Sequence, residues 1–149
     1  AHMSGAFTRM YEGAKISAVH LDLYLDGILS TLGLPADALA LIGFSQGTMM
    51  AMHVGLRRSP AVGAIIGYSG ALLGSEYLAA EARSKPPLLL VHGSVDDVVP
   101  VNALSHMQHT LDSQEIPYSA HIVPDHGHGI EQMGATLGRA FLQKNLSGT

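Results

Sequence analysis

Four short apolar segments, separated by segments with helical spacing, limit what this chain can fold into. They occupy residues 39–44, 61–70, 86–93 and 118–124. Short apolar runs without alternation are typical of strands that are buried on both faces. Strands that alternate with helices predict right-handed crossovers and a parallel sheet covered by helices on both faces. The sequence therefore predicts an α/β fold with a sheet of about four strands.

The segments before, between and after these strands carry the apolar spacing of helices. We expect helices over residues 13–32, 46–58, 75–83 and 102–114, and a last helix from about residue 130 to about residue 145. In the first helix, Ile16, Val19 and Leu25 lie at largely helical spacing. The helix at 46–58 is apolar nearly all round, which predicts deep packing. We interpret residues 1–12 as a cloning scar and N-terminal segment, and residues 13–146 as one domain.

The composition limits the partners of this chain. Of its 149 residues, 47% are hydrophobic and 13% are charged, and the net charge is −4. Typical domains carry about 25% charged residues, so the surface is short of charge, which favours contact with another chain. The eight Lys and Arg residues do not cluster, so no nucleic-acid footprint or basic membrane patch is predicted. No apolar run approaches the roughly 18–20 residues of a membrane span.

The absence of cysteine excludes disulfides, thiolate metal sites and a cysteine nucleophile. His106 and His109 share a helix face, but no acidic or cysteine ligand pattern accompanies them, so a metal site is not predicted. No other motif implies a cofactor. The first residues lack the pattern of a secretory signal, and we expect a cytoplasmic protein.

One strand ends in Gly43-Phe44-Ser45-Gln46-Gly47. The pattern Gly-x-Ser-x-Gly between a strand and a helix is typical of a nucleophile elbow. In such a sharp turn the serine backbone is strained. We expect that side chains at the two glycine positions, 43 and 47, would collide there. The hydroxyl is raised at a helix N-terminus, where free N–H groups favour developing negative charge. Ser69, at the end of the next strand, lacks this pattern and is expected to be a loop residue near the site.

A serine nucleophile needs a base, and two later strand ends offer the side chains for it. Asp96 and Asp97 follow the third strand, and His126 and His128 follow the fourth. The carboxyl ends of parallel strands lie at one edge of a sheet, where ligands bind. The chain order Ser, Asp, His is that of the α/β-hydrolases. In that arrangement the histidine takes the serine proton and the aspartate orients the histidine.

Three segments make the resemblance to a known family specific. They are "GFSQGT" (43–48), "HGSVDDVVP" (92–100) and "PDHGH" (124–128). The chain resembles the phospholipase/carboxylesterase family, which includes the acyl-protein thioesterases, over nearly its whole length. The resemblance implies Ser45 as the nucleophile, Asp96 as the acid and His128 as the base. It departs at Asp125, which stands where the family has glycine.

The resemblance implies a serine hydrolase that cleaves short- to medium-chain acyl esters or thioesters through an acyl-enzyme, without a cofactor. The N–H of Gln46 is then an oxyanion donor. We expect the apolar residues Leu72, Leu73 and Val99, which follow strand ends, to contact the substrate.

The chain also departs from the family before the elbow. Only 44 residues precede Ser45, whereas the family usually has several more strands there and a loop that supplies the second oxyanion donor. Strand 39–44 is therefore expected at an edge of the sheet, where it invites pairing with another chain. We expect a homo-oligomer through this strand, or a cover formed by residues 1–12 with "AFTRMY" as a short strand. The alternative to an active enzyme is a weak or inactive hydrolase fragment that serves as an oligomerisation or interaction module.

Overall fold

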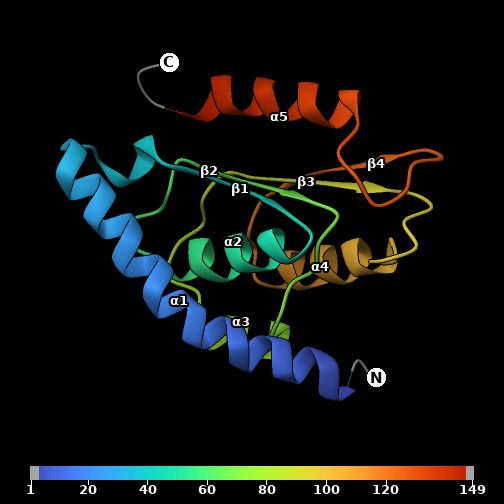
Figure 1. Cartoon of the computed structure of the whole chain (residues 1–149), viewed down its shortest axis with the longest axis horizontal. Coiled ribbons are helices and arrows are strands. Elements are labelled where there is room, and N and C mark those ends of the chain that lie inside the picture. The colour runs from blue at the N-terminus through green and yellow to red at the C-terminus, as the bar shows by residue number, and fades with distance from the viewer. Residues whose placement is uncertain (1–3, 147–149) are drawn as a thin grey trace.

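The computed structural model describes residues 4–146 and confirms the four predicted strands (Figure 1). The elements are α1 (Ser4–Leu32), β1 (Ala40–Phe44), α2 (Gln46–Arg57), β2 (Ala64–Tyr68), α3 (Leu78–Glu81), β3 (Leu88–Gly93), α4 (Asn102–Ser113), β4 (Ser119–Val123) and α5 (Gln132–Asn145). Short 3-10 turns over Ala36–Ala38 and Ser75–Tyr77 precede β1 and α3.

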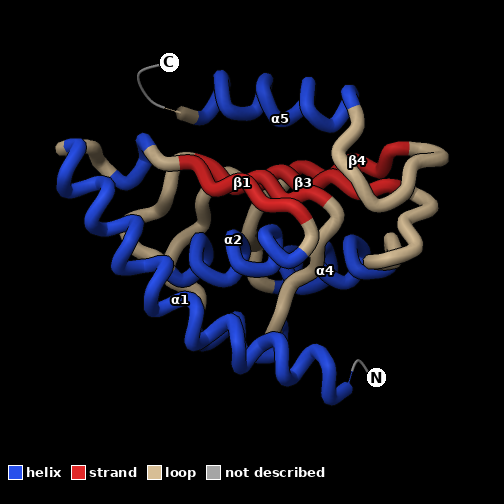
Figure 2. Tube along the Cα trace, viewed as in Figure 1, coloured by secondary structure: helices blue, strands red, loops and turns tan. Residues whose placement is uncertain are grey.

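The four strands form one parallel sheet in the order β1-β2-β3-β4. Because each crossover to the next strand is right-handed, α2, α3 and α4 all lie on one face of this sheet. α5 follows the last strand and lies on the other face (Figures 1 and 2). The predicted α/β class, with helices on both faces, is therefore confirmed. Because the strands are parallel, their carboxyl ends all lie on one side of the sheet, which we call its carboxyl edge.

The strands alternate their side chains between two apolar cores. On the α2 and α4 side, Ile65 and Leu90 pack with Met52, Leu56 and Leu104. On the α5 side, Ile66, Tyr68, Leu89, Val91 and Val123 pack against Leu137, Phe141 and Leu142. Helix α2 lies between the sheet and α1, so its residues from Thr48 to Leu56 are buried with the exception of Met50. This confirms the deep packing predicted for that helix.

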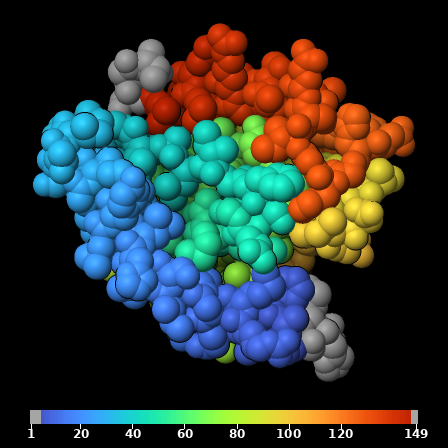
Figure 3. Space-filling view, in the orientation of Figure 1, coloured from blue at the N-terminus to red at the C-terminus, as the bar shows by residue number. Residues whose placement is uncertain are grey.

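Strand β1 lies at an edge, as predicted, because within residues 4–146 it pairs only with β2. A Cβ on Gly43 would meet the backbone of α2, so Gly43 faces that helix. Ile42 and Phe44 face the other side, where α5 covers β2 and β3. They are 56% and 39% exposed, respectively. The surface of β1 and the start of α2 is visible in Figure 3 between α1 and the loop after β4.

Helix α1 differs from the prediction in its start and in its buried face. It begins at Ser4 rather than near residue 13, so "AFTRMY" is helical and the expected short strand is wrong. The predicted boundary between residues 12 and 13 therefore falls inside one helix. Its buried residues are Tyr11, Ala14, Ala18 and Leu25, whereas Ile16 and Val19 are 68% and 58% exposed. Small alanines allow α1 to lie close to α2, where Ala18 and Leu25 contact Val54.

The interpretation of the first residues as a cloning scar concerns residues outside the described range. Among residues 4–146, none of the helices combines the length and apolar character that a bilayer span requires.

Candidate active site

Ser45 occupies the turn between β1 and α2 in a strained conformation. Its φ is 57° and its ψ is −115°, outside the broad regions that residues with a Cβ prefer. Two hydrogen bonds to one carbonyl hold this turn against β2. The Ser45 N–H donates to the Tyr68 oxygen at 2.9 Å, and the buried Thr48 Oγ1 donates to the same oxygen at 2.8 Å. The sheet therefore stabilises the strained turn from the neighbouring strand.

The two glycines of the motif have different steric roles. A Cβ on Gly43 would collide with the backbone of Gly47 and Thr48 in the first turn of α2. A Cβ on Gly47 would have nothing within 4 Å outside its own helix and its chain neighbours. The expected collision is thus confirmed at Gly43 and wrong at Gly47. The reason is that the helix turns its first residues outward, while β1 runs directly beneath them.

The structure joins Ser45, His128 and Asp96 in one chain of hydrogen bonds. His128 Nε2 lies 3.1 Å from Ser45 Oγ, and His128 Nδ1 lies 2.8 Å from Asp96 Oδ2. An ionised carboxylate can only accept, so Nδ1 carries the proton and Nε2 is free to accept from the serine hydroxyl. The unprotonated Nε2 of the imidazole is thereby directed at the Ser45 hydroxyl.

The carboxylate of Asp96 is buried but well supplied with donors. Its side chain is fully inaccessible to solvent, and Oδ1 accepts from the N–H groups of Val98 at 2.9 Å and Val99 at 2.8 Å. Burial alone would raise the pKa of Asp96. The hydrogen bonds from His128, Val99 and Val98 outweigh burial and hold that pKa below its ordinary value. Asp96 is therefore ionised at neutral pH and accepts the hydrogen bond from the Nδ1–H of His128.

The loop that carries His128 is fixed on the loop after β3. The N–H of Asp125 donates to Ser94 Oγ at 2.8 Å, and the N–H of Val95 donates to the His126 carbonyl at 3.0 Å. Gly93 lies so close to this loop that a Cβ would collide with the His126 carbonyl. Asp125 has a φ of 59°, a conformation that glycine adopts without cost. The loops after β3 and β4 thus hold Asp96 and His128 in fixed relation to each other.

The first turn of α2 presents free donors beside Ser45. The N–H groups of Thr48 and Met49 bond to the Ser45 carbonyl at 3.0 and 3.2 Å. The earlier N–H groups of Gln46 and Gly47 have no acceptor within the helix. They point out of a helix N-terminus, where partial positive charge favours an anion. The role of the Gln46 N–H as an oxyanion donor stays a prediction.

The other residues singled out from the sequence lie outside this chain of hydrogen bonds. Asp97 is exposed, and His126 Nε2 lies 3.6 Å from Glu131 Oε2. Leu72 and Leu73 are only 5% and 4% exposed and belong to the apolar core, so their contact with substrate stays a prediction. Val99 contributes its backbone to the site through Asp96, and the role of its side chain also stays a prediction.

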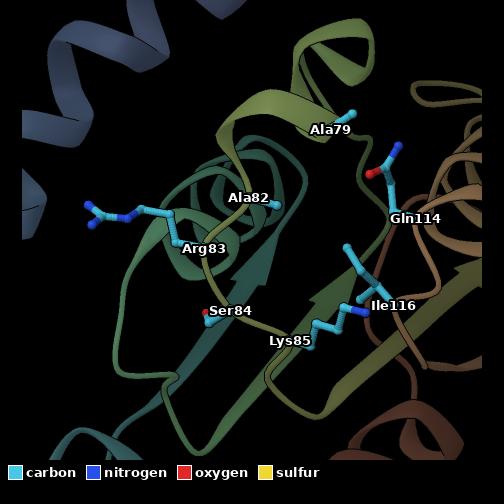
Figure 4. Close-up of a pocket in the computed structure, with 7 residues that line it drawn as sticks. All are labelled: Ala79, Ala82, Arg83, Ser84, Lys85, Gln114 and Ile116. Atoms are coloured by element: carbon cyan, nitrogen blue, oxygen red, sulfur yellow. The ribbon is translucent and has the colours of Figure 1, made fainter.

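One hollow of the described surface is remote from Ser45. It has a volume of about 310 Å³ and is lined by residues that precede β3 and β4, so it lies at the opposite edge of the sheet. There Lys85 lies beside Ile116, whereas Arg83 points away (Figure 4). A second hollow, of about 270 Å³, is formed by residues 126–131 and includes His128. This second hollow adjoins the hydrogen-bonded chain, because His128 belongs to both.

Two contacts of the site had no signal in the sequence. The ring of Phe44 lies 4.8 Å from that of His128, between ring centroids, although position 44 is a variable position of the motif. His92 Nε2 lies 2.8 Å from the Val99 carbonyl. Its place at the end of a strand predicted a role in shaping the turn that follows, although it did not predict this partner.

A parallel sheet with a serine at a strand-to-helix elbow, and an aspartate and a histidine after later strands, defines the α/β-hydrolase fold. The family profile described as phospholipase/carboxylesterase matches residues 20–146, and the chain belongs to that family. The crystal structure of esterase PE8 superposes with a TM-score of 0.91 at 38% identity, covering 98% of this chain and 68% of that one. Zea mays acyl-protein thioesterase 2 shares the fold, with a TM-score of 0.74 at 24% identity and coverage of 92% and 66%.

The similar proteins of known sequence are hydrolases by name. Acyl-protein thioesterase 1 of Schizosaccharomyces pombe is 37% identical over 91 residues, which are 59% of this chain and 40% of that protein. Acyl-protein thioesterase 1 of Gibberella zeae is 27% identical over 140 residues, which are 91% of this chain and 59% of that protein. The chain thus spans about half the length of these relatives.

Proposed function

We propose that this chain hydrolyses short- to medium-chain carboxylic esters or thioesters through an acyl-enzyme on Ser45. The observation that carries the proposal is the unbroken contact from Ser45 Oγ to His128 at 3.1 Å and from His128 to Asp96 at 2.8 Å. The fold positions all three groups at the carboxyl edge of the sheet. Membership in a hydrolase family supports the same reading.

The geometry supports a two-step reaction. His128 Nε2 takes the hydroxyl proton while Ser45 Oγ bonds to the acyl carbon, and the carbonyl oxygen becomes an oxyanion near the Gln46 N–H. Collapse of this intermediate expels the alcohol or thiol, which receives the proton from His128. Water then attacks the acyl carbon while His128 takes its proton, and His128 returns this proton to Ser45 Oγ as the bond to the acyl group breaks and the carboxylic acid leaves. Asp96 stays ionised and stabilises the imidazolium in both steps.

The oxyanion hole limits the expected rate. Within residues 4–44 the structure has α1, a 3-10 turn and β1, and none of these residues forms the loop that the resemblance implies for a second donor. Loss of one such donor costs about 10²–10³ in rate. We therefore expect slow but measurable hydrolysis by this chain. The cytoplasmic location expected from the sequence stays a prediction.

A fluorophosphonate probe tests the proposal because it labels only an activated serine. We expect stoichiometric labelling of the unmodified chain and none of Ser45→Ala. Ser69→Ala is the matched control, since Ser69 lies at the end of the adjacent strand and its buried hydroxyl has no hydrogen-bond partner among the described residues. Labelling that persists in Ser45→Ala, or a folded chain that is not labelled at all, contradicts the proposal.

The uncovered edge of β1 supports a second role as an oligomerisation module. Ile42 and Phe44 are exposed on a strand whose outer side pairs with no other strand among residues 4–146, and such an edge pairs readily with another chain. We propose that a second copy of this chain pairs with β1, either alongside catalysis or instead of it. Labelling separates the two cases, because a folded, oligomeric and unlabelled chain supports the module alone.

Sedimentation velocity tests the pairing. Ile42→Lys places a charge on the edge strand and is expected to convert an oligomer to monomer. Leu23→Lys is the matched control, since Leu23 is 66% exposed on α1. A monomeric unmodified chain, or equal dissociation by both variants, contradicts pairing through β1.

A further inference from the structure

His92 is a buried histidine that touches the acid of the proposed triad without touching the reacting serine. It lies near the end of β3 and is 1% exposed. Its Nε2 lies 2.8 Å from the Val99 carbonyl and 3.5 Å from Asp96 Oδ2. Its Nδ1 is buried and has no hydrogen-bond partner among the described residues.

These contacts determine the protonation of the His92 ring. A carbonyl oxygen can only accept, so Nε2 must carry the proton that lies toward Val99. A second proton on Nδ1 would bury a cationic ring whose Nδ1–H has no acceptor among the described residues, which is costly. The contacts therefore favour the tautomer of His92 with its proton on Nε2. The same nitrogen lies 3.5 Å from Asp96 Oδ2, so the ring also packs beside the carboxylate.

The bond to Val99 closes the turn that holds Asp96. The Val99 carbonyl accepts from His92, while the Val99 N–H donates to Asp96 Oδ1 at 2.8 Å. One residue thus connects the ring of His92 to the carboxylate of Asp96. We propose that His92 is a positioning residue, whose Nε2–H holds the 96–99 turn so that Asp96 Oδ2 stays directed at His128. This role rests on the proposed hydrolase function.

Packing alone does not account for a histidine at this position. A leucine has a similar volume and would fill the core beside Leu90 without a buried nitrogen that lacks a partner. The imidazole is useful here only through its Nε2 donor. Three variants separate these cases: His92→Leu removes the donor, His92→Gln keeps an N–H near the position of Nε2, and Leu90→Val disturbs the same buried strand two residues earlier.

Steady-state hydrolysis of p-nitrophenyl acetate measures the effect on the reaction. We expect His92→Leu to lower kcat by about tenfold to a hundredfold, the value of one hydrogen bond in a charged network, with KM little changed. His92→Gln is expected to retain most of kcat, and Leu90→Val to leave it unchanged. Equal kcat in His92→Leu and the unmodified chain, or an equal loss in Leu90→Val, overturns the proposal.

Proton and nitrogen NMR provide a measurement that does not need activity. In the unmodified chain we expect His92 to carry its proton on Nε2, and the Nδ1–H of His128 to be protected from solvent exchange. That protection is expected to be lost in His92→Leu and kept in His92→Gln and Leu90→Val. A proton on Nδ1 of His92 in the unmodified chain overturns the proposal even if a variant does not fold. Absent labelling of Ser45 rejects the hydrolase function instead, and leaves this measurement to decide the role of His92.

Discussion

Alanine substitution of the two elbow glycines tests the steric explanation of the turn. The sequence motif has glycine at both positions, but in the structure only a side chain at position 43 would collide. In Gly43→Ala, the new methyl group would collide with backbone atoms of Gly47 and Thr48, which cannot rotate away as a side chain can. Overpacking of this kind costs about 1–3 kcal/mol or more, and here it must displace the first turn of α2. Gly47→Ala places its methyl group in open space. Replacing a helical glycine by alanine is expected to stabilise α2 by up to about 1 kcal/mol.

Urea unfolding and the rate of fluorophosphonate labelling measure both effects in the same preparations. Gly43→Ala is expected to lower the free energy of unfolding and to slow labelling strongly, because the displaced turn moves Ser45 away from His128. Gly47→Ala is expected to be at least as stable as the unmodified chain and to be labelled at a similar rate. If Gly43→Ala matches Gly47→Ala in both measurements, the steric account of the elbow is wrong.

Three further changes test other parts of the structure by urea unfolding. Asp125 has a φ of 59°, which is strained for a residue with a Cβ. Asp125→Gly removes this strain and is expected to stabilise the fold by about 0.5–1 kcal/mol. A loss of stability would contradict this. Burial lowers the pKa of His53 from 6.5 to about 4. The unfolded chain therefore binds the proton first, and stability falls by up to about 3 kcal/mol between pH 6.5 and 4; His53→Leu should flatten this dependence. Tyr11→Phe removes the bonds from the buried Tyr11 hydroxyl to Glu81 at 3.2 Å and is expected to cost about 1–2 kcal/mol, whereas Tyr24→Phe, at an exposed position, should cost nothing measurable.

The sheet could be predicted from the sequence because each strand has a local signal. Short apolar runs such as 86–93 differ from the helical segments around them, and the alternation of strands and helices leaves few topologies. Helix α1 was harder, because apolar residues lie on more than one of its faces. The large Ile16 and Val19 suggested the buried face, yet the smaller Ala14 and Ala18 are buried. Close approach between helices is a property of the pair, and the sequence of one helix does not show it.

The location of the site could be predicted because its residues follow the carboxyl ends of strands, but the directions of their side chains could not. The order of Ser45, Asp96 and His128 along a parallel sheet predicts that they meet at one edge, and the structure places them in hydrogen-bonding distance. Spacing alone left Asp97 and His126 as alternatives, since neighbouring residues differ only in the direction of their side chains. The bond from His92 to Val99 depends on how the 93–99 loop folds back, which no local pattern specifies.

Trapping the acyl-enzyme tests whether Ser45 is the nucleophile of the proposed reaction. The chain is mixed with p-nitrophenyl acetate, quenched in acid during the first turnover and digested for mass spectrometry. If Ser45 is the nucleophile and His128 its base, we expect an acetyl group on Ser45 in the unmodified chain and none in His128→Ala. Release of p-nitrophenol without acetylation of Ser45, or at the same rate in Ser45→Ala, would contradict it.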